Sequence, residues 1–324
     1  MCALEIQHGT LVMTELPMPT LKPGELLLRT SHIGLNRADV LQLEGRYPAP
    51  EGASPIPGLE ASGTIAALGE GVTGWQLGQP ACALMAGGAY AEYAAVPAAQ
   101  TLPLPKNLSL AEAAALPEAA ATAWMALKRE AALQPGERVL LHGGTSGLGL
   151  LLGQIARGLG AEVFATVGSD EKIAFLKPYG ITAFNHRTAP FAPQVKDATG
   201  GEGVDVIIDT LGGPALSDHL SLLRRHGRMV TLAVMEGAVA EAAKISRILT
   251  HHLRWTGAML RNRSAAEKAE IMAEVGKTIW PMLENGTVKP HIDRIFSWAD
   301  AEKALQHMQE RLHLGKILLE VASK

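Results

Sequence analysis

The sequence predicts an α/β protein of two domains, in which a doubly wound parallel sheet accompanies a β-rich domain. Its 324 residues exceed what one hydrophobic core usually organises. The middle of the chain alternates aliphatic strand segments with helical segments, as a parallel sheet covered on both faces requires. The part before Leu110 is instead rich in glycine and proline, which favours short strands joined by tight turns.

The alternation begins after Leu110 with a helical stretch over 111–130. Apolar residues at helical spacing predict a helix from Leu150 to Gly158. Short aliphatic segments predict strands over 138–142, 162–167, 181–185, 205–209 and 228–234. Further helices are expected over 170–176 and 214–225. The mixed segment after Arg261 ends in a helix over 300–309 and a strand over 316–321.

Composition and charge narrow the range of partners. The formal net charge is −3, from 29 basic and 32 acidic residues, so we expect no nucleic-acid partner. Glu5 and Glu15 stand where a secretory signal would be basic and then apolar, and no segment approaches the roughly 20 apolar residues of a membrane helix. The two cysteines, Cys2 and Cys82, suit neither a disulfide framework nor a zinc ribbon. We therefore expect a cytoplasmic protein without membrane association.

The segment His142–Gly149, HGGTSGLG, follows a predicted strand and opens a predicted helix. A helix N-terminus offers free N–H groups to a phosphate, and glycines let the pyrophosphate of a dinucleotide approach. Gly144 and Gly149 hold the first and third places of the G-x-G-x-x-G fingerprint, whereas Ser146 holds the second. A glycine-rich turn without a ligand is the alternative. The predicted cofactor-binding residues here are Gly144, Thr145, Ser146, Gly147, Leu148 and Gly149.

The residues at the end of the second predicted strand distinguish an NAD site from an NADP site. An NAD enzyme usually has an acid near its tip to accept from the ribose 2′-OH, and none stands there. Basic residues and donors follow instead, among them Arg187, which suits the 2′-phosphate of NADPH. Asp170 and Glu171 oppose this assignment, and Lys172 on a solvated helix face is its alternative. The further residues expected at NADPH are Gly168, Ser169, Lys172 and His186.

Several short motifs occur in an order known from one family: NRAD at 36–39, GRYP at 45–48, PGLEASG at 57–63, GGAYAEY at 87–93, LPE at 116–118 and TAW at 122–124. With the glycine-rich turn, they make the chain resemble the zinc-free quinone oxidoreductases of the medium-chain dehydrogenase/reductase superfamily. It looks closest to their p53-inducible type. The resemblance implies a Rossmann NADP-binding domain over 119–261 and a discontinuous, β-rich GroES-like catalytic domain over 1–118 and 262–324.

The same resemblance implies that no metal is bound. The related zinc alcohol dehydrogenases have Cys in place of Asn36 and His in place of Leu59, and they carry a four-cysteine lobe that this chain lacks. A catalytic zinc ion usually needs three protein ligands of this kind. We expect the scattered histidines to be surface or packed residues: His8, His32, His142, His251 and His252.

The activity implied is direct hydride transfer from NADPH to a quinone, which stabilises the added charge itself. By the resemblance, Asn36 and Thr122 flank the nicotinamide, and Tyr47 lines the acceptor pocket with a flat face and a hydroxyl donor. Asn36 as a helix cap and Tyr47 packed on prolines are the alternatives. Lys316 either reaches the cofactor or is a surface lysine. The residues expected to cover the nicotinamide and its ribose are Leu232, Ala233, Met235, Met259 and Leu260.

The family usually dimerises by pairing the edges of two nucleotide-domain sheets. We expect a homodimer of this kind, with the edge at Arg228–Met235 or at His252–Gly257. Two other functions remain open from the sequence. One is an NADPH-dependent reductase of alkenal or enone double bonds, and the other a non-catalytic protein that binds a nucleotide or RNA.

Overall fold

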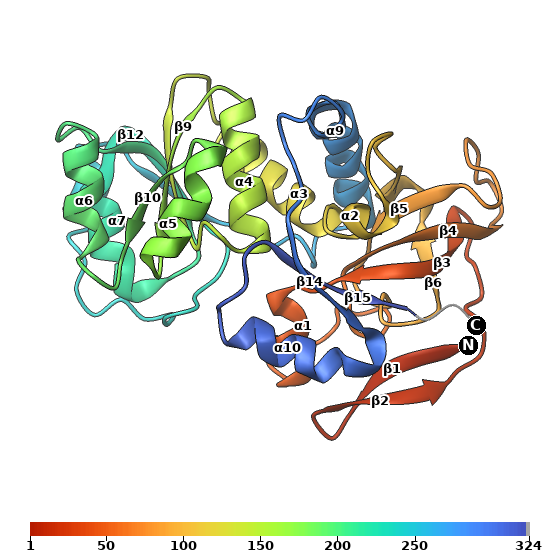
Figure 1. Cartoon of the computed structure of the whole chain (residues 1–324). Coiled ribbons are helices and arrows are strands. Elements are labelled where there is room, and N and C mark those ends of the chain that lie inside the picture. The colour runs from red at the N-terminus through yellow and green to blue at the C-terminus, as the bar shows by residue number, and fades with distance from the viewer. Residues whose placement is uncertain (322–324) are drawn as a thin grey trace. The chain divides into compact units, whose positions relative to one another are not determined.

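The computed structural model describes residues 1–321, which form two compact units (Figure 1). The first unit comprises Met1–Ala121 and the described chain from Leu260 on, and the second comprises Thr122–Met259. The domain boundaries expected from the sequence, at 118 and 262, lie beside these limits. Each unit is described by itself below.

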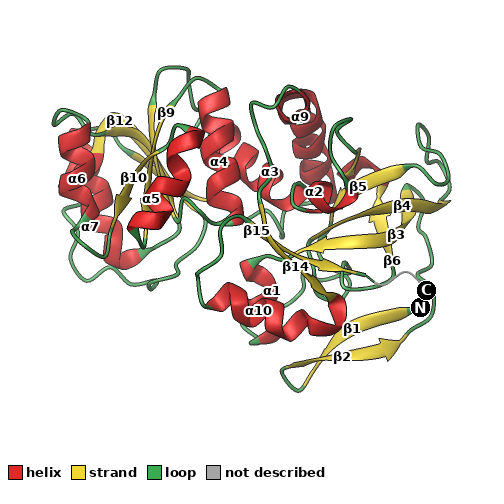
Figure 2. Cartoon of the chain, in the orientation of Figure 1, coloured by secondary structure: helices red, strands yellow, loops and turns green. Residues whose placement is uncertain are grey.

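The second unit contains a six-stranded sheet in the order β10-β9-β8-β11-β12-β13. All of its strand pairs are parallel. The strands are β8 (Arg138–His142), β9 (Glu162–Val167), β10 (Thr182–Asn185), β11 (Val204–Asp209), β12 (Leu223–Thr231) and β13 (Arg254–Gly257). The α-helices wholly within this unit are α4 (Gly147–Gly158), α5 (Asp170–Leu176), α6 (Phe191–Ala198), α7 (Leu216–Leu222) and α8 (Ser246–Thr250) (Figure 2). Shorter 3₁₀ turns are η3 (Lys177–Tyr179) and η4 (Gly213–Ala215).

The aliphatic strand pattern explains this architecture. Successive residues of a strand face opposite sides of the sheet, and both sides of β8 are buried. Leu140 belongs to an apolar cluster that includes Val195 of α6 and Leu220 of α7. On the other side, a Cβ added to Gly153 of α4 would lie 3.5 Å from Leu141. Helices thus cover both faces, and the predicted doubly wound Rossmann sheet is confirmed.

Three details differ from the sequence-based expectation. The stretch 111–130 is divided into α2 (Leu110–Ala114), α3 (Pro117–Trp124) and a π-helical turn η2 (Met125–Glu130), with Pro117 opening a new helix. The helix expected over 214–225 is shorter, because β12 begins at Leu223, which pairs with Val204 of β11. Of the two segments expected as a sheet edge, Arg228–Met235 is wrong, since β12 pairs with β11 on one side and β13 on the other. The other segment, His252–Gly257, contains β13, the last strand of the sheet.

The first unit is built mainly of antiparallel strands. A seven-stranded sheet has the order β14-β15-β3-β4-β5-β7, with β6 also paired to β3, and β1 and β2 form a separate hairpin. The strands are β1 (Cys2–Gln7), β2 (Thr10–Glu15), β3 (Glu25–Gly34), β4 (Glu60–Leu68), β5 (Pro80–Leu84), β6 (Tyr93–Pro97), β7 (Thr101–Pro103), β14 (Ile292–Ser297) and β15 (Lys316–Glu320). The helices are α1 (Arg37–Leu43), α2, α9 (Ala265–Glu284) and α10 (Ala301–Gln309), with 3₁₀ turns η1 (Ala98–Gln100) and η5 (Trp298–Asp300).

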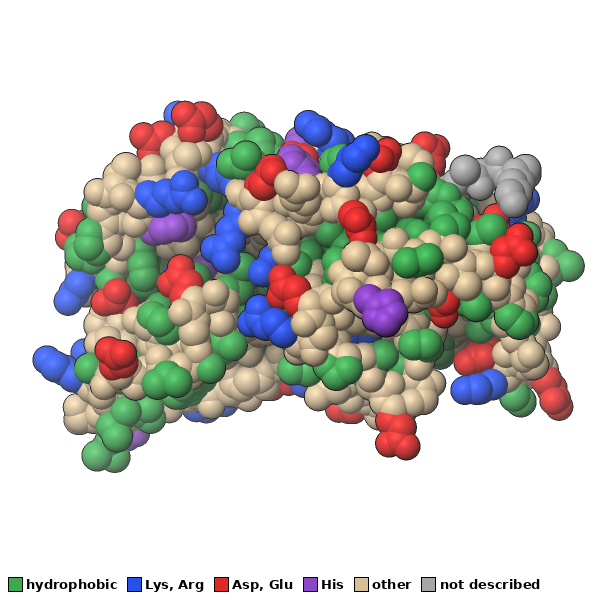
Figure 3. Space-filling view, turned by 90° about the horizontal axis from the view of Figure 1, so that it is seen from below, with side chains coloured by type: hydrophobic (Ala, Val, Ile, Leu, Met, Phe, Trp, Pro, Cys, Tyr) green, Lys and Arg blue, Asp and Glu red, His purple; other side chains and the backbone are tan. Residues whose placement is uncertain are grey.

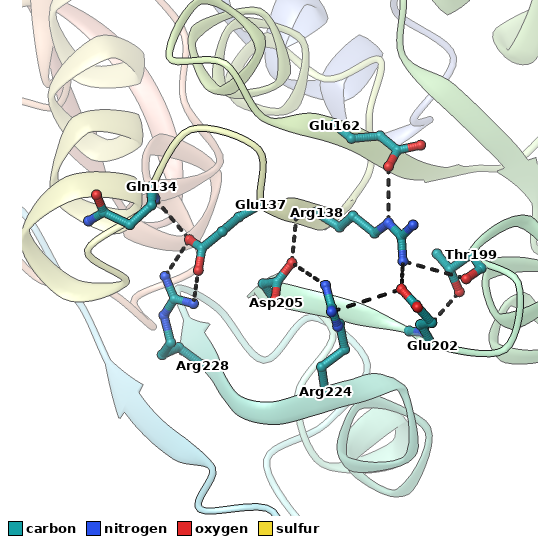
Figure 4. Close-up of polar contacts among 10 residues, drawn as sticks. Gln134, Glu137, Arg138, Glu162, Thr199, Glu202, Asp205, Arg224 and Arg228 are labelled. Atoms are coloured by element: carbon teal, nitrogen blue, oxygen red, sulfur yellow. Dashed lines mark hydrogen bonds and ion pairs between the residues drawn. The ribbon is translucent and has the colours of Figure 1, made fainter.

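Ion pairs join the strands of the second unit where β8, β11 and β12 begin (Figure 4). Arg228 of β12 donates two 2.7 Å hydrogen bonds to the two carboxylate oxygens of Glu137. Its Nε donates to the Ala131 carbonyl at 2.8 Å. Arg138, which is more exposed than Arg228, pairs with Glu162 at 3.0 Å and with Glu202 at 2.7 Å. This network lies at the amino ends of the strands, away from the turn that begins α4.

The surface agrees with the small net charge. On the face shown in Figure 3, acidic and basic side chains are interspersed. Among residues 1–321, no helix combines the length and the apolar character needed to cross a membrane.

Candidate active site

The glycine-rich turn joins β8 to α4. Ser146 caps the helix, and its hydroxyl accepts a 3.0 Å hydrogen bond from the Gly149 amide. A Cβ on Gly144 would lie 2.7 Å from the Ala165 Cβ, and one on Gly149 would overlap the Gly143 carbonyl. Only glycine therefore lets the strand, the turn and the helix pack this closely. The helix N-terminus presents amide donors and a positive dipole end, which fits a dinucleotide pyrophosphate.

Most of the predicted cofactor residues lie at the carboxyl ends of the parallel strands. Gly144, Thr145, Ser146, Gly147, Leu148 and Gly149 follow β8; Gly168, Ser169 and Lys172 follow β9; His186 follows β10; Leu232, Ala233 and Met235 follow β12; Met259 follows β13. Ligands of open α/β sheets bind at these carboxyl ends. Leu260 is buried in the first unit, so the structure does not group it with the others.

Arg187, one of the basic residues that the sequence predicts near the 2′-phosphate, lies beside the end of β9. A Cβ built on Gly168 would lie 3.3 Å from the Arg187 Nε, so this guanidinium stands over the end of β9. The Asn185 carboxamide donates to Asp170 at 2.8 Å and so engages one of the two acids that opposed NADPH. A positive group at the tip of the second strand suits a 2′-phosphate. The parallel pairing of β10 with β9 brings Arg187, which follows β10, to this place.

A buried polar network lies beside the carboxyl ends of these strands. His142 Nε2 lies 2.7 Å from His219 Nε2, and His142 Nδ1 lies 2.9 Å from the Thr166 hydroxyl. Burial lowers the pKa of both histidines, so both are neutral at pH 7. Asp209 accepts from the amides of Leu211 and Gly212 at 2.8 and 3.1 Å and so holds the turn after β11. His142 is thus a packed residue, one of the two places expected for it.

In the first unit, Asn36 and Lys316 lie together. Lys316 Nζ donates to the Asn36 carboxamide oxygen and to the Leu35 carbonyl, both at 2.7 Å, and it pairs with the Glu60 carboxylate. Asn36 Nδ2 donates to Glu60 at 2.9 Å. Glu60 is fully buried and Lys316 is 5% exposed. An ammonium has three N–H donors, and all three have acceptors here. Lys316 is therefore not a surface lysine, and its part in cofactor binding stays a prediction.

Asn36 also caps helix α1, the alternative role foreseen for it. Its backbone N–H donates to Asp39 at 2.8 Å, and the Tyr90 hydroxyl donates to the same carboxylate oxygen at 3.2 Å. Burial raises the pKa of Asp39 to about 6, although these donors and the nearby Lys316 ammonium lower it. The cap and the ion pair together fix the carboxamide in place.

Tyr47 is half-buried on the loop after α1. The guanidinium carbon of Arg261 lies 5.0 Å from the centroid of its ring. Within residues 1–321 the Tyr47 hydroxyl has no hydrogen-bond partner. Burial raises its pKa and Glu118 adds to that rise, so the hydroxyl is protonated and can donate at neutral pH. Thr122, the third predicted catalytic residue, is buried on α3 in the second unit.

The residues beside Asn36 do not fit a catalytic zinc ion. Neither Asn36 nor the buried Leu59 supplies a thiolate or imidazole ligand. The Lys316 ammonium already places a positive charge against Glu60 and Asn36. Across the described chain, 1–321, no group of three or more His, Cys, Asp or Glu side chains could hold a metal ion.

Comparisons with known proteins agree with both units. Residues 22–106 match the alcohol dehydrogenase GroES-like domain, and residues 147–275 match the family described as zinc-binding dehydrogenase. The human synaptic vesicle membrane protein VAT-1 homolog is 30% identical over 316 residues, which cover 93% of this chain and 80% of that protein. The chain belongs to the medium-chain dehydrogenase/reductase superfamily. The GroES-like fold of the first unit is thereby confirmed.

Solved structures with this fold include enzymes of several specificities. Mycobacterial Rv1454c complexed with NADPH is 28% identical with a TM-score of 0.88, covering 99% of this chain and 100% of that one. CurK enoyl reductase is 28% identical with a TM-score of 0.87, covering 99% of each chain. 2-Haloacrylate reductase is 26% identical with a TM-score of 0.83, covering 100% of each.

Some relatives are far longer than this chain. A mycocerosic acid synthase-like polyketide synthase of Mycobacterium tuberculosis is 30% identical over 303 residues. The match covers 92% of this chain but spans only 14% of that synthase.

Proposed function

We propose that this medium-chain dehydrogenase/reductase is a zinc-independent NADPH:quinone oxidoreductase that works by direct hydride transfer. The buried contact of Lys316 with Asn36 and Glu60 carries the proposal. By the resemblance, the zinc enzymes of the superfamily have a cysteine ligand in place of Asn36, and here the Lys316 ammonium donates to the Asn36 carboxamide. A second cation beside this ammonium would be repelled at short range. The acceptor must then stabilise negative charge without a metal. A quinone does so because its reduced form is a delocalised phenolate.

The nucleotide-binding residues support NADPH as the donor. When bound, NADPH supplies the hydride that the reaction needs. The Ser146-capped turn offers amides to the pyrophosphate, and Arg187 offers a charged donor to the 2′-phosphate. NADPH in the mycobacterial relative supports the same assignment.

Tyr47 is the residue proposed to meet the acceptor. Its hydroxyl is protonated and free to donate, so it can form a hydrogen bond to the quinone oxygen that gains charge. The half-buried ring offers a flat face to a planar acceptor. Asn36, held by Glu60 and Lys316, keeps a rigid polar group next to α1. The proton that completes the hydroquinone comes from solvent or through Tyr47.

An acceptor panel tests the proposal. Fluorescence titration should give tighter binding of NADPH than of NADH, and oxidation of NADPH should be fastest with quinones. Tyr47→Phe should lower kcat/KM for a quinone by about tenfold or more, the loss expected for one transition-state hydrogen bond. Background oxidation with every acceptor would refute the proposal and favour a non-catalytic nucleotide-binding role. Stoichiometric zinc in elemental analysis would refute zinc independence.

A second candidate is an NADPH-dependent reductase of alkenal or enone double bonds. Likeness to CurK enoyl reductase and 2-haloacrylate reductase favours it. The same Tyr47 donor would stabilise the enolate oxygen formed when hydride adds to the β-carbon. Rapid turnover of 2-alkenals with negligible quinone reduction would establish this function and displace quinone reduction, including the p53-inducible type suggested by the motifs.

We also propose a homodimer formed through β13. This strand pairs with β12 on one side and, among residues 1–321, with no strand on the other. Trp255 on it is 52% exposed, although its indole donates to the Thr231 hydroxyl. Pairing of two such edges would satisfy their backbone groups and cover the indole. Light scattering should give a dimer for the wild type and a monomer for Trp255→Pro, which removes a backbone donor from the unpaired side of β13; a monomeric wild type would refute the proposed dimer.

A further inference from the structure

Arg261 is a buried arginine that ties three separate segments of the first unit together. Its Nε donates to the Ala86 carbonyl at 2.8 Å, and its Nη1 donates to the Tyr47 carbonyl at 3.1 Å. Its Nη2 donates to the Gln42 carboxamide oxygen at 2.6 Å. The side chain is 4% exposed. Because these acceptors surround a planar fork, the position of the guanidinium is fixed.

The guanidinium also faces the Tyr47 ring. At 5.0 Å from the ring centroid, it lies within the range of a cation–π contact. The Tyr47 hydroxyl makes no hydrogen bond within residues 1–321. Arg261 thus contacts both the carbonyl and the ring face of Tyr47, whose amide donates to the Leu41 carbonyl at 3.1 Å.

Further hydrogen bonds hold both Gln42 and the backbone of Arg261 in place. Gln42 lies on α1, the helix capped by Asn36, and its Nε2 donates to the Pro55 carbonyl at 3.0 Å. Lys268 of α9 is buried, and its ammonium donates to the Arg261 carbonyl at 2.9 Å. Arg261 thereby connects the loop of Tyr47 to the helix of Asn36, the two residues of this unit assigned to the reaction.

We propose that Arg261 is a positioning residue for Tyr47, which it holds with the hydroxyl turned toward the acceptor and strengthens as a hydrogen-bond donor. This inference rests on the proposed function, in which Tyr47 donates to the acceptor oxygen. The electrostatic direction agrees with it, because Arg261 lowers the pKa of Tyr47 against the opposite effects of burial and Glu118. A hydroxyl that loses its proton more readily is the better donor to a developing oxyanion.

A double-mutant cycle tests the proposal on the full-length enzyme. Arg261→Lys keeps the charge but loses the planar fork, so kcat should fall about tenfold while KM stays within about twofold. In a Tyr47→Phe background the same change should alter kcat by less than about twofold, because the donor it positions is gone. Equal losses in both backgrounds would show a general structural role and overturn the proposal. Arg263→Lys is the matched control, since Arg263 pairs with Glu267 at 3.3 Å.

A second measurement does not depend on turnover. The chain has 4 tyrosines, so protein labelled with 3-fluorotyrosine should give a small set of ¹⁹F resonances, and Tyr47→Phe identifies the one of Tyr47. Arg261→Lys and the milder Gln42→Met should shift this resonance and leave those of the other tyrosines in place. An unmoved Tyr47 resonance would overturn the proposal even in an active enzyme. If these variants shift the Tyr47 resonance but the wild type reduces no acceptor, the proposed function is refuted and the positioning role is retained.

Discussion

The ammonium of Lys316 and the carboxamide oxygen of Asn36 are joined by a 2.7 Å hydrogen bond, although the two residues lie 280 positions apart. The same ammonium neutralises Glu60, which no water reaches. Removing one member of a buried pair leaves the other charge without compensation, and this costs more than the pair contributes when intact.

Lys316→Met should therefore lower the free energy of unfolding by about 3–5 kcal/mol, the usual loss when a buried pair is broken. Lys303→Met is the control, because Lys303 pairs with Asp300 on the surface and its side chain is 75% exposed. The control should leave stability nearly unchanged, because a surface ion pair contributes little. Urea denaturation measures both, and equal small losses would contradict the uncompensated-charge argument.

Arg187→Ala should weaken NADPH binding by about tenfold to a hundredfold, the value of one charge-assisted hydrogen bond, and leave NADH binding unchanged. The reason is that only NADPH carries a 2′-phosphate for the guanidinium near Gly168. Arg225→Ala removes a charge of the same sign near the start of β12, at the amino ends of the strands, and should change the affinity for neither coenzyme. Fluorescence titration decides, and equal weakening of both coenzymes would argue against this contact.

Asp39 should make stability depend on pH. Its pKa is raised to about 6 by burial, so between about pH 4 and 6 the folded chain keeps a proton that the unfolded chain loses. Stability contributed by this group is thus present at low pH and falls as the pH rises, by about 3 kcal/mol in total. Asp39→Asn, which does not titrate, should lack this decrease. A constant difference between wild type and variant from pH 4 to 7 would contradict the assignment.

Arg228→Met should lower the free energy of unfolding by about 2–3 kcal/mol, since it removes two charged hydrogen bonds from Glu137 and one from the Ala131 carbonyl. Arg138→Met is the comparison, because Arg138 pairs with Glu162 and Glu202, whose side chains are 55% and 58% exposed (Figure 4). That change should cost about 1 kcal/mol or less. Chemical denaturation gives both values, and an Arg138 loss as large as that of Arg228 would refute the ranking.

Periodicity and turn chemistry alone predicted the Rossmann unit and the turn at Gly144–Gly149. They are local signals: three aliphatic residues of β8 mark a strand buried on both faces, and Ser146 and the glycines determine how the chain enters α4. The absence of an acid at the end of the second strand is a local signal too, and it pointed to NADPH. The edge strand was assigned in two ways, and only the tertiary structure distinguished β12 from β13, because strand order is not encoded in the spacing of apolar residues.

The polar contacts of the first unit could not be predicted from the sequence, since they join residues far apart in the chain. The sequence allowed two roles for Lys316, a cofactor contact or a surface position. Folding buries this lysine against Asn36 and Glu60. Arg261 had no local motif at all, yet its fork meets Gln42 and Tyr47. The sequence determined which segments become strands, helices and a phosphate-binding turn. The tertiary structure decided which charges lie buried together, because the partner of a buried charge is chosen by chain topology and desolvation rather than by sequence spacing.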